Sequence, residues 1–190
     1  MIELKIKNRL QYTPFPYLVI NNFLEKNSAL QILVALKKQQ FEHKECDLFS
    51  LNQTKDFIFV KDKVIKEFYN YFKSNIFLKN VEKLFKVKLT GKLDMAGSLY
   101  KNCDYLLCHD DDLENRMIAF VYYLSGSKQG LEGGEFLLYD SNSKGRPEKD
   151  VRKIMPKFNS ILFFKVSTKS FHEVSEIIKG ERYAIGGWLS

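Results

Sequence analysis

Cysteine is scarce in this chain of 190 residues. Its three copies, Cys46, Cys103 and Cys108, form an odd set with no Cys-x-x-Cys spacing. Small domains that are held together by disulfides need a denser and even set. We therefore expect unbridged cysteines and a reducing compartment, and we expect the Cys108 side chain to be buried by packing.

Long apolar runs and a targeting segment are also missing. Residues 1–5 carry charged side chains and lack the apolar region of a secretory signal. No apolar run approaches the roughly 20 residues of a membrane helix. No internal repeat or low-complexity linker divides the chain, and 45% hydrophobic residues are enough for a core. These features predict a cytoplasmic, single-domain protein over residues 1–190 with no membrane partner.

Acidic residues are fewer than basic ones, 23 against 30, which gives a net charge of +7. A basic balance favours polyanions such as RNA or ribosomes. However, the Lys and Arg residues form no dense cluster, which is typical of solvated protein faces. We expect no direct nucleic-acid specificity.

The spacing of apolar and turn residues predicts two kinds of structure along the chain. Residues 1–24 should be extended, because Pro14 and Pro16 exclude a helix, with a strand at 17–20. Helices are predicted after the Asn27-Ser28 pair to about residue 40, at 61–75 and at 81–85, and residues 47–53 form a strand or structured loop. The first helix should bury Leu30, Leu33, Val34 and Leu36. Short strands then follow at 92–100, 103–108, 116–125, 135–139, 151–155, 160–166, 171–177 and 182–189.

Eight short strands separated by turns are typical of a sandwich or jelly roll rather than of a βαβ sheet. The predicted fold is therefore mainly β with N-terminal helices, in the form of a double-stranded β-helix (jelly roll). Residues 1–90 would be a helical support region, and residues 91–190 the double-stranded β-helix core.

Histidine occurs only at positions 43, 109 and 172. In the pattern His109-x-Asp111, two residues of an extended strand share one face. With His172 from a later strand they make two imidazoles and one carboxylate, the facial triad of non-haem Fe(II) oxygenases. The same alternation turns Cys108 and Asp110 away from the metal. His43 lies in a polar stretch and is predicted to be a surface residue.

Arg182 is the first residue of the last predicted strand, and it favours an iron site over a zinc site. Zinc also accepts two His and a carboxylate. A hydrolytic zinc site has no use for the Arg, whereas the dicarboxylate 2-oxoglutarate needs a cationic fork. Asp112 is either a surface charge or an acceptor for a ligand His.

Six segments carry a resemblance beyond this pattern: residues 105–111, 116–124, 133–139, 156–164, 170–176 and 182–188. Together with Tyr100 and residues 47–53 they resemble the catalytic domain of the OGFOD-type prolyl hydroxylases. The resemblance covers nearly the whole chain. It implies an Fe(II)- and 2-oxoglutarate-dependent enzyme that uses O2, with ascorbate as a candidate reductant. The implied reaction is 3-hydroxylation of a prolyl residue in a small-subunit ribosomal protein.

The same resemblance assigns roles to residues. His109, Asp111 and His172 would hold Fe(II), and Arg182 would pair with the distal carboxylate of 2-oxoglutarate. Tyr123 would hydrogen-bond this cosubstrate and Tyr100 would lie beside it, although both could be core aromatics. Asn159 and Phe164 would shape a strand turn and the pocket wall.

The sequence departs from the family at its end. Eukaryotic members carry a second, non-catalytic double-stranded β-helix domain, whereas this sequence stops at Ser190. We expect a single-domain form whose substrate is open to question. The alternatives are the same chemistry on free proline or another protein, and a non-catalytic jelly-roll binding module. The complete triad and Arg182 favour the enzyme.

Overall fold

Strands dominate the protein. The structure, a computed structural model, describes residues 10–113 and 115–190. The strands are β1 (Tyr17–Asn21), β2 (Glu42–Cys46), β3 (Phe49–Gln53), β4 (Leu93–Tyr100), β5 (Tyr105–His109), β6 (Ile118–Tyr123), β7 (Glu132–Gly133), β8 (Phe136–Ser141), β9 (Pro147–Ile154), β10 (Ser160–Lys165), β11 (His172–Val174), β12 (Ile177–Lys179) and β13 (Arg182–Leu189).

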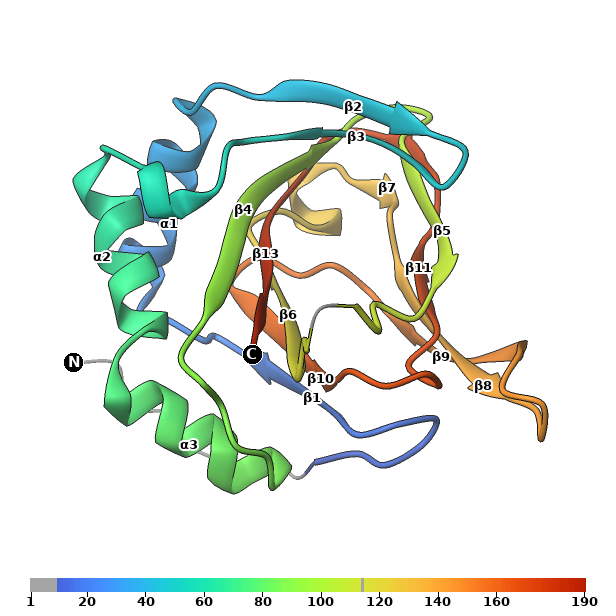
Figure 1. The fold of residues 1–190 in the computed structure, drawn as a ribbon. Helices are drawn as coiled ribbons and strands as arrows, with labels where there is room; N and C mark the ends of the chain where they lie inside the picture. The colour runs from blue at the N-terminus through green and yellow to red at the C-terminus, as the bar shows by residue number, and fades with distance from the viewer. Residues whose placement is uncertain (1–9, 114) are drawn as a thin grey trace.

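Eleven of these strands form one antiparallel sheet. Its order is β1-β10-β6-β13-β4-β3-β5-β11-β8-β9, with β2 paired to β3, while β7 and β12 form a separate pair. Figure 1 shows that the large sheet curls around an interior. The predicted mainly-β jelly roll is thereby confirmed.

Three helices lie together on one outer side of the curled sheet (Figure 1). They are α1 (Lys26–Lys37), α2 (Lys63–Phe72) and α3 (Asn75–Phe85), and the described residues also form two short 3-10 turns, η1 (Phe57–Phe59) and η2 (Ser127–Gln129). Asp62 caps α2, and Ser74 caps α3, by accepting hydrogen bonds from the first-turn amides. The predicted start of the third helix at residue 81 was six residues too late, because Ser74 provides the cap.

The first helix differs from its prediction at both its start and its face. Glu25, rather than the Asn27-Ser28 pair, caps α1 by accepting from the Ser28 amide. The buried residues are Ala29, Ile32, Ala35 and Leu36, whereas Leu30 and Val34 are 42% and 53% exposed. Leu36 packs against Gly97 of β4, and α1 also contacts α2. The buried face is therefore the one that carries Leu36 and Ile32 together with the two alanines.

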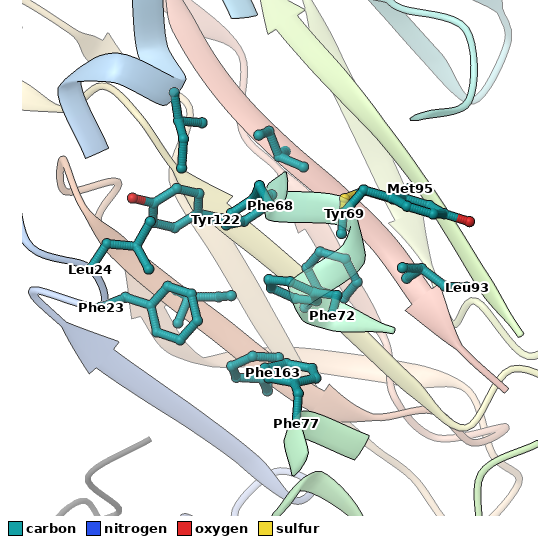
Figure 2. Close-up of a cluster of buried hydrophobic side chains, with 14 of the residues drawn as sticks. Phe23, Leu24, Phe68, Tyr69, Phe72, Phe77, Leu93, Met95, Tyr122 and Phe163 are labelled. Atoms are coloured by element: carbon teal, nitrogen blue, oxygen red, sulfur yellow. The ribbon is translucent and has the colours of Figure 1, made fainter. Parts of the chain in front are cut away.

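The middle strands are buried on both faces, and alternate residues serve two cores. In β6, Phe120 and Tyr122 join the cluster under the helices, while Ala119 and Tyr123 face the barrel interior. Figure 2 shows the outer cluster, in which Phe72 of α2 packs among aromatic rings from the sheet and α3. This cluster leaves the inner face of the same strands free to build a site.

Residues before position 90 supply strands as well as helices. β1 pairs with β10, and β3 pairs with β4 at one end and with β5 at the other. β3 therefore joins the two halves of the barrel, and it confirms the strand that was one of two readings of residues 47–53. The sequence did not indicate β2, because all five of its residues are exposed and show no apolar alternation.

The cysteines are unbridged, as predicted. Cys108 is half-buried rather than buried, and this burial, with nearby Glu173 and Asp110, raises the pKa of its thiol to about 11. In the part of the chain that the structure describes, no helix is long and apolar enough to cross a membrane.

Candidate metal centre and cosubstrate pocket

A cavity of about 570 Å³ opens inside the curled sheet. Its lining includes His109 at the end of β5, Asp111 just beyond it, His172 of β11, Tyr100 of β4 and Arg182 of β13. The structure thus brings five of the six predicted site residues to one cavity. The sixth, Tyr123, is fully buried beside Arg182.

The two histidines are cross-strand neighbours. His109 pairs with His172 where β5 and β11 run antiparallel, and the ring centroids are 4.2 Å apart. Nδ1 of His109 lies 2.8 Å from the carbonyl of Leu107, and Nδ1 of His172 lies 2.7 Å from that of Ser170. A carbonyl only accepts, so each Nδ1 carries a hydrogen, and in the neutral imidazole each Nε2 keeps a lone pair. Both Nε2 atoms can therefore bind a metal.

Asp111 reaches the histidines from a turn, not from a strand. β5 ends at His109, and Asp111 has a left-handed φ of 63°. Its Oδ1 lies 3.4 Å from Nε2 of His109, and its Oδ2 lies 3.4 Å from Nε2 of His172. The predicted strand alternation of His109 and Asp111 was therefore wrong, because Asp111 reaches the histidines through a turn. The three side chains offer ligand atoms that all lie within 4.8 Å of one another.

Hydrogen bonds to Asp110 stabilise the turn that carries Asp111. The Asp110 carbonyl accepts a 2.7 Å hydrogen bond from the Ser170 hydroxyl, and its carboxylate accepts one from the Asp112 amide. Asp112 is exposed. It is a surface charge rather than an acceptor for a ligand His, because both Nδ1 atoms already donate to carbonyls.

The charge of the donor set suits a divalent metal. Burial alone would raise the pKa of the Asp111 carboxyl, but hydrogen bonds and charge from His109 and His172 hold it well below its usual range. Burial disfavours the protonated form of His109, but the hydrogen bond and charge of the neighbouring Asp111 carboxylate raise the pKa of the His109 imidazole overall. A buried anion between two imidazoles is the ligand set of first-row metals such as iron and zinc.

Sequence reasoning missed two residues that contact Asp111. Trp188 donates its indole N–H to Oδ2 at 3.0 Å. Arg116 places Nη1 3.6 Å from Oδ1 and its guanidinium 3.7 Å from the centre of the Trp188 ring. One signal was available, since Trp188 lies six residues after Arg182 and therefore faces the same side of β13.

Arg182 is a buried cation with a free donor. It is 1% exposed, and its Nε donates to the Gly134 carbonyl at 3.1 Å. Its Nη2 has no hydrogen-bond partner among the described residues, and neither has the hydroxyl of Tyr123. The guanidinium lies 5.0 Å and 5.1 Å from the ring centres of Tyr100 and Tyr123.

The chemistry of this pair fits a carboxylate. Burial raises the pKa of both tyrosines to about 12, against smaller opposing effects of the Arg182 charge and, at Tyr123, of the Arg182 N–H groups directed at its oxygen, so both hydroxyls stay neutral and keep a hydrogen to donate. Buried donors without partners are costly and rare. A carboxylate would satisfy Nη2 and the Tyr123 hydroxyl and would neutralise the cation.

The remaining predicted residues lie as expected. Phe164 lines the cavity, with its ring 4.7 Å from that of His172. Asn159 forms a turn with a φ of 61° and bonds the Leu24 backbone. His43 is exposed on β2 beside Glu45.

Comparisons with known proteins agree on one family. The sequence model of the 2OG-Fe(II) oxygenase superfamily matches residues 95–190. Prolyl 3-hydroxylase OGFOD1 of Xenopus laevis is 34% identical over 183 residues, which cover 95% of this chain and 36% of the relative. Prolyl 3-hydroxylase sudestada1 of Drosophila melanogaster is 34% identical over 187 residues, covering 93% and 34%. The chain thus spans about a third of the length of these curated relatives.

Solved structures share the fold at low sequence identity. A Pseudomonas putida prolyl-4-hydroxylase superposes with a TM-score of 0.75 at 14% identity and covers 91% of both chains. A prolyl hydroxylase from Trichoplax adhaerens, in complex with a peptide fragment of hypoxia inducible factor, gives 0.71 at 20% identity and covers 91% of this chain and 82% of that one. The chain belongs to the 2OG-Fe(II) oxygenase superfamily, which implies Fe(II), 2-oxoglutarate and O2 as its reagents.

Proposed function

We propose that this protein hydroxylates a prolyl residue of a protein substrate, with Fe(II), 2-oxoglutarate and O2. One observation carries the proposal. A cavity with two imidazole Nε2 atoms and a carboxylate on one wall also holds the buried guanidinium of Arg182, whose Nη2 has no hydrogen-bond partner among the described residues. A metal site alone explains the first feature but not the second.

Each residue has a role in this proposal. His109, Asp111 and His172 hold Fe(II). Arg182 binds the distal carboxylate of 2-oxoglutarate, and Tyr123 donates its hydroxyl hydrogen to that group. When bound, iron and 2-oxoglutarate supply the oxidising chemistry that converts a substrate C–H group to C–OH, with succinate and CO2 as the other products.

The aromatic wall around His172 orients it and keeps water out. Phe136 stacks on the His172 ring at 5.0 Å with an interplanar angle of 13°, and Phe164 packs on it from a tilted direction. These contacts leave the imidazole little freedom to rotate away from the metal. An apolar wall also protects an oxidising site from side reactions with water.

The relatives support the prolyl substrate and the position of the hydroxyl group. Xenopus and Drosophila relatives are named prolyl 3-hydroxylases, and that of Ostreococcus tauri is named a prolyl 3,4-dihydroxylase. We propose 3-hydroxylation of a small-subunit ribosomal protein in the cytoplasm, as the family resemblance implies. Ascorbate serves as reductant, and the substrate is recognised as protein rather than as nucleic acid.

A turnover assay tests the reaction. Iron-loaded protein should convert 2-oxoglutarate to succinate faster when proline-containing peptides from small-subunit ribosomal proteins are present. Mass spectrometry should find one added oxygen atom on a prolyl residue. Asp111→Ala should abolish both signals, and His43→Ala, an exposed histidine outside the cavity, should leave them unchanged.

The same assay separates the alternatives. Turnover that responds to free proline and to no peptide would replace the protein substrate. Peptide binding without succinate, in a preparation with full iron occupancy, would indicate a non-catalytic module and contradict the proposal.

A further inference from the structure

We propose that Trp188 is a positioning residue that makes Asp111 a monodentate metal ligand. In this inference, which rests on the proposed function, the indole N–H holds Oδ2 and leaves Oδ1 for the metal. A carboxylate that bound through both oxygens would occupy one more coordination position. The Trp188 bond would thereby keep a position open for the cosubstrates.

The three candidate ligands are held in different ways. His109 and His172 each donate Nδ1–H to a carbonyl two residues earlier, which fixes their rings within their own segments. Asp111 has no such local support. It sits in a turn with a left-handed backbone, and Trp188 makes the one hydrogen bond to its carboxylate from outside the triad among the described residues.

Trp188 is well placed to act as a rigid donor. It lies on β13, which pairs with β4 on one side and β6 on the other, with Trp188 opposite Asp94 and Ala119. The Arg116 guanidinium stacks on its ring at 3.7 Å. A side chain in the middle of a sheet thus restrains a ligand on a turn.

The two oxygens of Asp111 are not equivalent. Oδ2 accepts the 3.0 Å bond from Trp188. Each oxygen lies 3.4 Å from Nε2 of one histidine, Oδ1 from that of His109 and Oδ2 from that of His172. Oδ1 also lies 3.6 Å from Nη1 of Arg116, which is beyond hydrogen-bonding distance. Among the described residues outside the triad, only Oδ2 therefore has a hydrogen-bond donor, which leaves Oδ1 as the oxygen for the metal.

Trp188→Phe removes the N–H and keeps an aromatic ring under Arg116. Mn(II), a redox-stable substitute for Fe(II), provides the readouts. We expect its affinity, measured by calorimetry, to fall about 10- to 100-fold, as for other residues that orient a ligand. We also expect fewer metal-bound waters in the variant, counted from the broadening of the Mn(II) electron paramagnetic resonance lines in water enriched in oxygen-17.

Tyr122→Phe is a matched control. It also removes one buried hydrogen bond from an aromatic ring, that of the Tyr122 hydroxyl to Asn159 at 2.9 Å, but on the helix-covered face of the sheet. Its Mn(II) affinity and water count should equal those of the unmodified protein. A Trp188→Phe variant that behaves like Tyr122→Phe would overturn the positioning role and leave the proposed function intact.

A second measurement needs no variant and covers the case in which Trp188→Phe does not fold. Trp188 is the only tryptophan, so its indole N–H gives one resonance in a nitrogen-15-labelled protein. On saturation with diamagnetic Zn(II) this proton should stay protected from exchange with water, because its bond to Asp111 persists. Rapid exchange after Zn(II) binding would show that the bond breaks and would overturn the inference. A protein that binds neither metal would overturn the proposed function as well.

Discussion

At the scale of one residue, the buried guanidinium of Arg182 is the proposed contact for the distal carboxylate of 2-oxoglutarate. Replacing it with Lys keeps the charge but removes the planar fork that bonds a carboxylate. Bonds to charged groups contribute about 1.5–3 kcal/mol. We therefore expect Arg182→Lys to weaken 2-oxoglutarate binding about ten- to hundredfold, since each ~1.4 kcal/mol is tenfold. Titration of anaerobic, iron-loaded protein, followed by its charge-transfer absorption, measures this.

Tyr123→Phe tests a weaker contact to the same carboxylate of 2-oxoglutarate. It removes a neutral donor, which is worth about 0.5–1.5 kcal/mol, so its effect should be smaller than that of Arg182→Lys. Iron affinity should stay unchanged in both variants, because the triad is intact. Equal 2-oxoglutarate affinity in all three proteins would place the cosubstrate carboxylate elsewhere.

Single residues also mark the limit of what the sequence could predict. The pattern of two His, one Asp and a late Arg identified side chains that the fold does bring together. It could not reveal that Asp111 sits on a left-handed turn, because alternation describes strands only. It also gave no role to Trp188, since a hydrogen bond between residues far apart in sequence depends on how the barrel closes.

At the scale of an element, β13 depends on two adjacent glycines that differ in their surroundings. A Cβ on Gly187 would overlap the backbone carbonyl of Asp94 on the neighbouring strand. A Cβ on Gly186 would meet its nearest atom, the Phe120 carbonyl oxygen, at 3.5 Å, which is ordinary contact. We expect Gly187→Ala to reduce the free energy of unfolding by about 1–3 kcal/mol, the usual cost of overpacking. Denaturant titration measures it.

Gly186→Ala is the matched control on the same strand. It should change stability by less than about 0.5 kcal/mol, as substitutions without strain do. If Gly187→Ala reduced the free energy of unfolding as little as Gly186→Ala does, β13 would have to be able to shift away from β4.

The elements that were mispredicted share a physical cause. In α1, Leu36 finds room beside Gly97 of β4, and a local sequence pattern does not contain such a contact between residues far apart in the chain. β2 pairs along its whole length with β3 while all its residues are exposed, so apolar alternation cannot indicate it. Strands buried on one or both faces were found because burial leaves a pattern in the sequence.

At the scale of the whole molecule, the turn-separated strands predicted the jelly roll, but not its closure through β3. That closure builds two cores of apolar side chains, one under the helices and one in the interior, which pack without a metal, although His172 lies between Phe136 and Phe164 of the interior core. The fold should therefore not depend on metal. We expect protein treated with a chelator to keep one cooperative thermal transition, unlike small domains that unfold without zinc.

Metal binding should still add stability, because the ligand set forms only in the folded state. A metal at about 100 times its Kd adds ~2.7 kcal/mol. For a chain of this size each kcal/mol raises Tm by about 2–4 °C, so Mn(II) should raise Tm by about 5–11 °C. His172→Ala should abolish this metal-dependent rise, while His43→Ala should retain it in full, because His43 is exposed on β2. Scanning calorimetry of the chelated and Mn(II)-loaded forms measures the shift. A chelated protein that shows no transition would mean that the metal holds the fold together, and an equal rise in both variants would place the metal away from the triad.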